Sequence, residues 1–245
     1  MNLGIMQPYF FPYIGYFQLM AYVDRWVVFD ETQFIHKGWV NRNRVLHPNL
    51  EKQWQYVTVP LAKKSRDEQI CNLLIHPDDG WRNQILGKLT SYRKKAPYYA
   101  ETMEFVAACF DCKEQSLVAF LVSVLRKTQK HIGFETQIDV QSDLNLADLH
   151  VEHAGQWSLR IAEQLGASSY INPAGGVALF REDEFSDAGI ELKFLESQPS
   201  PYDQGGRDFI AGLSIIDVLM WNGKETAKGM LSSNFTLKTA NAIAS

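Results

Sequence analysis

Two polar side chains follow predicted β-strands, at the positions where α/β proteins place their ligands. Gln7 comes directly after the apolar segment 3–6, and Asp30 follows segment 25–29, which is rich in β-branched and aromatic residues. Because the carboxyl ends of parallel strands lie at one edge of a sheet, we expect this amide and this carboxylate to face one crevice. Asp30 would serve there as a general base or as an anchor for an amine. The alternative is that Asp30 only caps a turn.

The segment between these two side chains is rich in aromatic residues. Pro8 and Pro12 exclude regular structure from this part of the chain, and a helical pattern begins near Gly15. So much aromatic surface is costly to leave in water, so it must line either a core or a pocket. We predict a substrate pocket, with a purely structural core as the alternative. The tyrosines expected to line the pocket are Tyr9, Tyr13 and Tyr16.

A basic segment follows at residues 36–44. Arg42 and Arg44 are two residues apart, so their side chains point the same way on an extended chain. Arginine binds phosphate and carboxylate groups through paired hydrogen bonds, which makes an anion the expected ligand. Lys37 and Asn43 add a charge and an amide to the same substrate site. The alternative is a solvated, charged loop.

Three further positions are candidates for chemistry. His76 follows the predicted strand 71–75 and is a candidate general acid or base. Ser214 is expected to cap a helix with Asp217 at its third position, and the amino end of such a helix attracts an anion. Tyr202 lies in the preceding Pro- and Gly-rich loop. We therefore add Tyr202, Ser214 and Asp217 to the predicted substrate site.

Cysteine and histidine positions indicate no metal or redox site. The three cysteines form no even disulfide framework, and Cys109 and Cys112 lie in a helical stretch rather than in a redox motif. His150 and His153 are accompanied by no further ligands at metal-binding spacing. The sequence therefore predicts no metal and identifies no cofactor, and the odd cysteine count suits a reducing compartment.

The composition and charge of the chain exclude some classes of protein. The chain has 245 residues, of which 46% are hydrophobic and 21% charged, and its net charge is −4. Domains that bind nucleic acids in general are strongly basic, so that class is excluded. No apolar run reaches the roughly 18 residues that a membrane span needs, and the N-terminal segment lacks the basic residues of a signal peptide. We expect a cytoplasmic protein that acts on small molecules.

Strand-like and helical segments alternate along the chain, which predicts an α/β fold with a mostly parallel, Rossmann-like sheet. We expect a single domain over residues 1–245, with an extra helical layer or subdomain at about 81–132. The last fifteen residues are polar and are expected to be loose. Strands are predicted at 3–6, 25–29, 55–61, 71–75, 137–140, 169–172 and 191–195, and helices at 15–23, 81–92, 99–110, 115–132, 157–165, 180–188 and 214–221.

Six motifs are spread along the chain. They are Met-Gln-Pro-Tyr-Phe-Phe-Pro-Tyr-Ile-Gly-Tyr-Phe at 6–17, Phe-Asp-Glu-Thr-Gln-Phe at 29–34, Trp-Val-Asn-Arg-Asn-Arg at 39–44, Val-Thr-Val-Pro at 57–60, Tyr-Arg-Lys-Lys-Ala-Pro-Tyr at 92–98 and Leu-Ser-Ile-Ile-Asp at 213–217. In matching order over nearly the whole chain, these motifs resemble the WbqC-like family of bacterial proteins. The resemblance implies aminoacyl or acyl transfer, such as glycine transfer, to an amine of a sugar in O-antigen, related surface-glycan or natural-product biosynthesis. It places Gln33 in the site beside Gln7, Asp30, Arg42, Asn43 and Arg44, with Asp217 as a further candidate.

Two other functions are compatible with the sequence. The order strand, proline-containing loop, helix, strand is that of the cytidylyltransferase-like fold, which suggests ATP-dependent nucleotidyl transfer or carboxylate activation. Tyr13 and Tyr16 stand where those enzymes carry two histidines, and tyrosine supplies no cation to a leaving phosphate. The second alternative is a non-catalytic sugar-binding protein of glycan assembly. The expected partners are an amine or nucleotide-sugar substrate and an acyl donor on a carrier.

Overall fold

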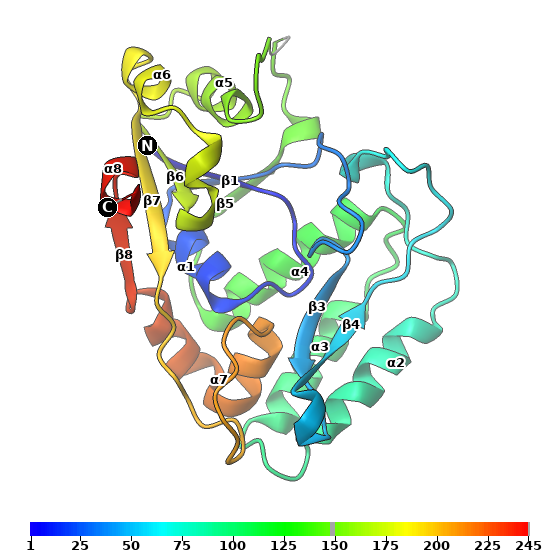
Figure 1. Cartoon of the computed structure of the whole chain (residues 1–245). Helices are drawn as coiled ribbons and strands as arrows, with labels where there is room; N and C mark the ends of the chain where they lie inside the picture. The colour runs from blue at the N-terminus through cyan, green and yellow to red at the C-terminus, as the bar shows by residue number, and fades with distance from the viewer. Residues whose placement is uncertain (148–149, 245) are drawn as a thin grey trace.

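The computed structural model describes residues 1–147 and 150–244, and within them the chain forms a six-stranded sheet and a separate two-stranded hairpin (Figure 1). The strand order in the large sheet is β5-β2-β1-β6-β7-β8. All neighbours pair in parallel except β7 and β8, which are antiparallel. The α/β prediction with a mostly parallel sheet is therefore confirmed. The strands are β1 Asn2–Met6, β2 Arg25–Val28, β5 Gln137–Val140, β6 Ser169–Pro173, β7 Glu191–Ser197 and β8 Phe235–Lys238.

The sheet has one point at which the chain reverses its direction of winding. From the central β1 the chain moves outward through β2 to β5, and it then returns to the other side of β1 with β6 and β7. In doubly wound folds, ligands bind outside the carboxyl ends of the strands at such a switch point. The carboxyl edge near β1 and β6 is therefore the first place to search for a site.

Helices cover both faces of the sheet (Figure 1). One core contains Trp26 and Val28 of β2 and the buried side chains of α1 to α4 and α7, so the helices near 81–132 share the core of α1. A second core contains Leu3, Ile5 and Val27 from the opposite face, packed against the other helices. The helices are α1 Ile14–Tyr22, α2 Gly80–Leu89, α3 Tyr99–Phe110, α4 Leu117–Ile132, α5 Gln156–Gln164, α6 Glu182–Asp187, α7 Ile215–Leu231 with a kink at Gly223, and α8 Ala240–Ala244.

A hairpin lies between β2 and β5 in the sequence. It consists of β3 Arg42–Leu46 and β4 Trp54–Thr58, which pair in antiparallel register with Arg44 opposite Tyr56. Since side chains alternate along a strand, Arg42 and Arg44 share one face with Trp54 and Tyr56, whereas Asn43 and Val45 face the core. The hairpin thus turns an arginine-aromatic face away from the core.

Two segments differ from the sequence-based prediction. The predicted strand 71–75 begins instead as a 3₁₀ turn, η2 Ile70–Asn72, followed by isolated bridges from Leu74 to Ser116 and from Ile75 to Leu61. Because neighbouring residues pair with different partners, no continuous ladder forms.

The C-terminal residues, predicted to be loose, form β8 and α8. The partly buried Phe235 and Leu237 alternate with polar residues, a strand pattern that the polar composition obscured.

Candidate functional site

Half of the aromatic opening loop belongs to the protein core. Phe10 and Phe11 have no exposed surface, and Phe10 packs near the rings of Phe110 and Phe120. Tyr16 is 1% exposed, contacts Trp26, and donates its hydroxyl hydrogen to the Gln7 carbonyl at 3.1 Å. Tyr16 is therefore closed to a ligand in this structure, contrary to its predicted place in the pocket.

Tyr9 and Tyr13 remain partly exposed on the other side of the loop. Burial raises the pKa of both hydroxyl groups, and the proximity of Tyr13 adds to the effect on Tyr9. Both phenols are therefore neutral hydrogen-bond donors at physiological pH. Gln7 is also partly exposed at the end of β1.

The loop is held in place by two buried side chains that the sequence assigns to substrate. The Asn43 amide donates to the carbonyls of Phe10 and Phe11 at 3.1 and 2.8 Å, and its oxygen accepts from the Arg44 N–H. The Ser214 hydroxyl, at the amino end of α7, also donates to the Phe11 carbonyl at 2.8 Å. Asn43 is 3% exposed and Ser214 is 0% exposed, so both position the loop rather than face a ligand.

The arginine-aromatic face, formed by Trp39, Arg42, Arg44, Trp54 and Tyr56, borders this loop. Arg42 lies over the Tyr56 ring at 4.0 Å and donates to the carbonyls of Lys37 and Gly38. The Arg44 guanidinium lies 5.2 Å from the rings of both Trp39 and Trp54. Its Nη2 donates to the Gly212 carbonyl at 3.3 Å, whereas its Nε is buried without a partner among the described residues. The Nε atoms of Arg82 and Arg207 are also buried without a partner among the described residues, so what distinguishes Arg44 is this donor together with its contact to Gly212.

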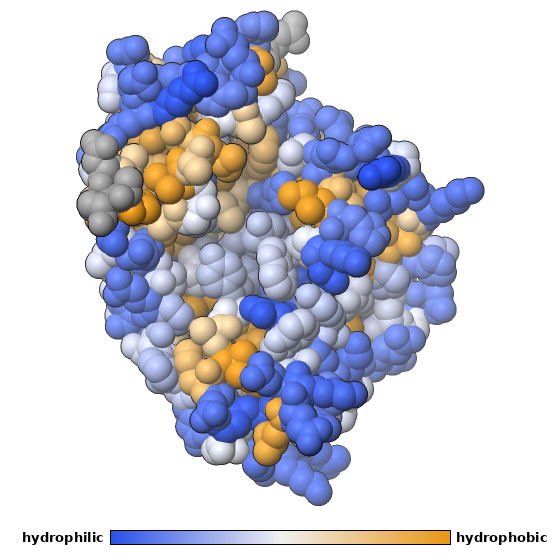
Figure 2. Space-filling view, viewed as in Figure 1, coloured by the Kyte–Doolittle hydropathy of each residue, from blue (hydrophilic) through white to orange (hydrophobic). Residues whose placement is uncertain are grey.

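A hollow of about 490 Å³ lies at the carboxyl ends of β6 and β7, and Arg44 is not among the residues that line it. Figure 2 shows that residues of intermediate hydropathy gather at the centre of this face, next to an apolar patch over the 3₁₀ segment η5, Ala174–Leu179. Gly212 lines the hollow and also accepts from Arg44, so the two features adjoin. The hollow is lined by Tyr13, Gly15, Leu19, Pro173, Ala174, Gly175, Leu195, Glu196, Ser197, Pro199, Ala211 and Gly212.

The amino end of α1 opens at this hollow. The residue that precedes the helix, Tyr13, makes no side-chain capping bond among the described residues, and Gly15 of the first turn lines the cavity. A Cβ atom on Gly15 would lie 2.5 Å from the Tyr13 ring and 2.8 Å from the Ser197 hydroxyl. Glycine therefore permits the close packing here. A helix amino end and a nearby arginine together favour a phosphate or carboxylate.

Asp217 is a buried anchor rather than a substrate ligand. It is 0% exposed and accepts hydrogen bonds from the Tyr92 hydroxyl at 2.6 Å, the Tyr202 hydroxyl at 2.6 Å and the Gln204 amide at 2.9 Å. Burial raises the pKa of this carboxyl group although these bonds oppose the shift. The Tyr92 hydroxyl in turn accepts from the Leu46 N–H of β3. Asp217 and the hydroxyl of Tyr202 thus join the 199–213 loop to the hairpin.

Asp30 lines a different cavity from the hollow. It is 1% exposed and accepts from the Ser142 N–H at 3.1 Å and the Ser142 hydroxyl at 2.6 Å, and burial raises its pKa. The groove that it lines, of about 660 Å³, runs along α4 and shares no lining residue with the hollow. The predicted crevice that unites Asp30 with the tyrosines is therefore not formed, because the buried part of the opening loop fills the space between β1 and the hairpin.

The other predicted site residues are dispersed. His76 is exposed, accepts from the Asp78 N–H at 3.2 Å, and lines a third cavity that meets the Asp30 groove at Glu114. Gln33 is exposed and donates to Asp67 at 2.9 Å. Lys37 is exposed and has a positive φ of 67°. Neither Gln33 nor Lys37 lines the hollow.

Sequence reasoning missed Trp39, Trp54, Tyr56 and Gly212 as site residues. For Trp54 and Tyr56, the sequence pattern contains a signal. Alternation along 54–58, set opposite 42–46, places Trp54 and Tyr56 on the face of the arginines. The contact with Gly212 joins residues 168 positions apart and has no local signature.

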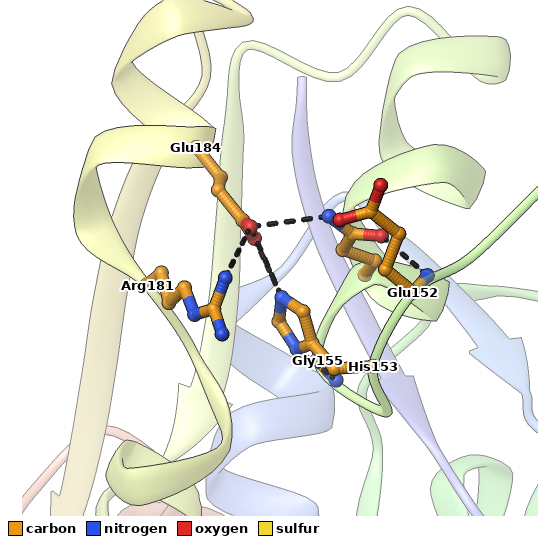
Figure 3. Close-up of polar contacts among 6 residues, drawn as sticks. Glu152, His153, Gly155, Arg181 and Glu184 are labelled. Carbon is orange, nitrogen blue, oxygen red and sulfur yellow. Dashed lines mark hydrogen bonds and ion pairs between the residues drawn. The ribbon is translucent and has the colours of Figure 1, made fainter.

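A polar cluster outside the hollow fastens α5 to α6 (Figure 3). The Glu184 carboxylate accepts from His153 Nε2 and Gln156 Nε2, and Arg181 lies within 3.4 Å of it. The Gly155 N–H donates to His153 Nδ1 at 3.3 Å, so the neutral ring carries its proton on Nε2. This arrangement gives His153 a structural role.

Among the described residues, no helix combines the length and the apolar character needed to cross a membrane.

No solved structure gives a significant match to this chain. Among curated proteins, the uncharacterized protein Rv1507c of Mycobacterium tuberculosis is 24% identical over 226 residues, which cover 91% of this chain and 95% of that protein. The profile of the WbqC-like protein family matches residues 7–229. The fold, the opening motif and this match over most of the chain agree, and the protein belongs to the WbqC-like family.

Proposed function

We propose that the protein transfers an acyl or aminoacyl group, such as glycyl, to an amine of a sugar or related metabolite that is carried on a phosphate. The observation that carries this proposal is the buried Nε of Arg44, which has no acceptor among the described residues, on a side chain whose Nη2 donates to Gly212 at the hollow. A nucleotide-sugar or a phosphate-linked carrier would complete the hydrogen bonds of Arg44. Its sugar would contact Tyr13 and the small side chains around it. The biological setting that the family suggests is surface-glycan or natural-product biosynthesis.

The chemistry requires a neutral amine. The amine nitrogen attacks the acyl carbonyl of an activated donor, the bond to the donor's leaving group breaks, and the amine loses a proton. Glu196 is the carboxylate that lines the hollow, but its hydrogen bonds with Lys238 and Gln198 lower its pKa and make it a weak base. The neutral amine must then come from the solution equilibrium or from a base outside the hollow, for which the sequence-predicted candidate is Asp30.

Substitution of Asp30 distinguishes these two sources. If Asp30 acts as the base, Asp30→Asn abolishes turnover and preserves substrate binding. If the solution equilibrium supplies the amine, Asp30→Asn preserves turnover, and the rate rises with pH until the pKa of the amine is passed.

The proposal is tested by product formation. Purified protein is incubated with nucleotide-linked amino sugars and with aminoacyl thioesters or acyl phosphates, and the N-acylated product is measured by mass spectrometry. Loss of a charge-assisted hydrogen bond costs about 1.5–3 kcal/mol, so Arg44→Gln should lower kcat/KM by about 10- to 150-fold. The control Lys94→Gln changes an exposed cation outside the cavities described here. Binding without product would identify a sugar-binding protein instead.

A second candidate function is ATP-dependent nucleotidyl transfer or carboxylate activation. The observation that favours it is the uncapped amino end of α1, which follows the central strand β1 at the switch point of the sheet. Pyrophosphate release from ATP in the presence of amino acids or other carboxylates would support this function. No release with any carboxylate would count against it.

A further inference from the structure

The Asp30 groove carries charges of both signs that do not neutralise one another. Its acidic residues are Asp30, Asp143 and Glu114, and its basic residues are Arg126, Lys127 and Lys130. Within residues 1–147 and 150–244, no ion pair joins any acid of the groove to any of its bases. Arg126 instead donates to the Ile138 carbonyl, and Lys127 to the Ala108 carbonyl.

The two signs lie at opposite ends of the groove. The lining residues of α4 and its preceding turn run from Ser116 to Lys130, which is about 21 Å of helix at 1.5 Å per residue. At one end, Asp30 is fixed by Ser142, just beyond the carboxyl end of β5. At the other, Arg126 reaches the carbonyl of Ile138, which lies inside that strand. The bases occupy the last turns of α4.

The acidic end is suited to an ammonium group. The Asp30 carboxylate lines the groove and accepts from the Ser142 N–H and hydroxyl, which fix its two oxygens there. Asp30 and Asp143 line the same cavity, and burial, with a smaller contribution from the charge of Asp143, raises the pKa of Asp30. A cation between them would relieve this repulsion.

The basic end is suited to an anion of more than one charge. Three cations lie within five residues of α4. A phosphate monoester carries nearly two negative charges at pH 7 and several strong acceptor oxygens. The volume of the groove, about 660 Å³, is within the range of small-molecule sites.

We propose that the Asp30 groove is a binding site for a small metabolite that carries both a primary ammonium group and a phosphate, with the ammonium on Asp30 and Asp143 and the phosphate on Arg126, Lys127 and Lys130. This site shares no lining residue with the hollow. The inference concerns binding alone and stands whether or not acyl transfer takes place in the hollow.

Isothermal titration calorimetry with four matched probes tests this site. Glucosamine 6-phosphate carries both groups, glucose 6-phosphate lacks the amine, glucosamine lacks the phosphate, and phosphoethanolamine retains both charges without the sugar. We expect glucosamine 6-phosphate to bind at least tenfold more tightly than glucosamine or glucose 6-phosphate. It should also bind more tightly than phosphoethanolamine, whose two charges are too close together to reach both ends of the groove. No heat with either dipolar probe at millimolar concentration, or equal affinity for all four, would overturn the proposal.

Variants at each end assign the two charges. Asp30→Asn should weaken glucosamine 6-phosphate at least tenfold and leave glucose 6-phosphate unchanged. Asp143 is exposed, so Asp143→Asn provides the same test if Asp30→Asn does not fold. Arg126→Gln with Lys130→Gln should weaken all three phosphate-bearing probes and leave glucosamine unchanged. The control Lys94→Gln should change none of the affinities, and variants at both ends that bind like the wild type would refute the assignment.

Discussion

At the scale of single residues, the two most informative side chains are an arginine with one buried donor that has no acceptor among the described residues and a carboxylate that accepts from three donors. The Arg44 guanidinium lies 5.2 Å from the ring centroids of both Trp39 and Trp54, yet its buried Nε has no acceptor among the described residues. Asp217 is more deeply buried, and its neutral donors satisfy it. Arg44 therefore retains a donor that the proposed phosphate can use, whereas Asp217 stabilises the fold.

The raised pKa of Asp217 predicts a specific dependence of stability on pH. The folded state binds the proton more tightly than the unfolded state, so the contribution of Asp217 is fully present below its unfolded pKa of about 4. That contribution is lost as the pH rises through the folded pKa. The free energy of unfolding of the wild type, minus that of Asp217→Asn, should therefore fall with pH in this window.

Urea unfolding of both proteins at pH 4 to 8 measures this difference, and contributions of other titrating groups, including Asp30, cancel in it. A difference that is constant or that rises with pH would contradict the assignment of a raised pKa to Asp217. The hydroxyls of Tyr92 and Tyr202, whose pKa values are also raised by burial, stay protonated throughout.

At the scale of elements, the arginine-aromatic face and the 199–213 loop are joined through Asp217. The connection to the hairpin runs through Tyr92 to Leu46, and the connection to the loop runs through Tyr202 and Gln204. We expect Tyr92→Phe to speed amide hydrogen exchange mainly in the hairpin, and Tyr202→Phe to speed it mainly in the loop. Asp217→Asn should affect both elements.

Hydrogen exchange followed by mass spectrometry resolves these segments, and β1 and β6 serve as internal controls. Each lost bond to the carboxylate corresponds to about 1–3 kcal/mol, or roughly 5- to 150-fold in exchange rate if the element opens locally. Uniform acceleration in all three variants would show that Asp217 stabilises the whole protein rather than these two elements.

The first turn of α1 offers a matched pair of glycine substitutions. Gly15→Ala would bring a Cβ to within 2.5 Å of the Tyr13 ring, so the ring must move and stability should fall by about 1–3 kcal/mol. Gly87→Ala in α2 meets no atom within 4 Å and should stabilise the protein by about 0.5–1 kcal/mol. Thermal or urea unfolding measures both changes. Equal effects of the two substitutions would exclude close packing at Gly15.

At the scale of the whole molecule, the sequence predicts the sheet better than the site. Dense β-branched and aromatic segments such as 25–29 identify strands because burial on both faces selects those residues. The positions of Gln7 and Asp30 at the carboxyl edge of the sheet also follow from the sequence, because β1 and β2 pair in parallel and each residue comes just after the end of its strand. Which cavity each side chain enters depends on how the hairpin and α2 to α4 pack between β2 and β5, and this packing has no local sequence signal.

The same reasoning explains the misassigned residues. Asn43, Ser214 and Asp217 are polar residues in recognisable motifs, which fits a ligand site and a buried structural network equally well. Only the three-dimensional structure shows that their hydrogen bonds go to Phe10, Phe11 and Tyr202. The contact between Arg44 and Gly212 is likewise visible only in the folded chain.

The central claim is that Arg44 binds the phosphate of a ligand in the hollow, and NMR of protein labelled with ¹⁵N-arginine tests it most directly. On addition of UDP or pyrophosphate, the Arg44 Nε–H signal should shift as this group gains an acceptor. The Nε–H of Arg42, which already donates to Gly38, and that of Arg207, which is also buried without a partner among the described residues, should not shift. If the Arg44 signal stays unchanged at millimolar concentrations of both ligands, the account of the hollow as a phosphate-binding site is contradicted.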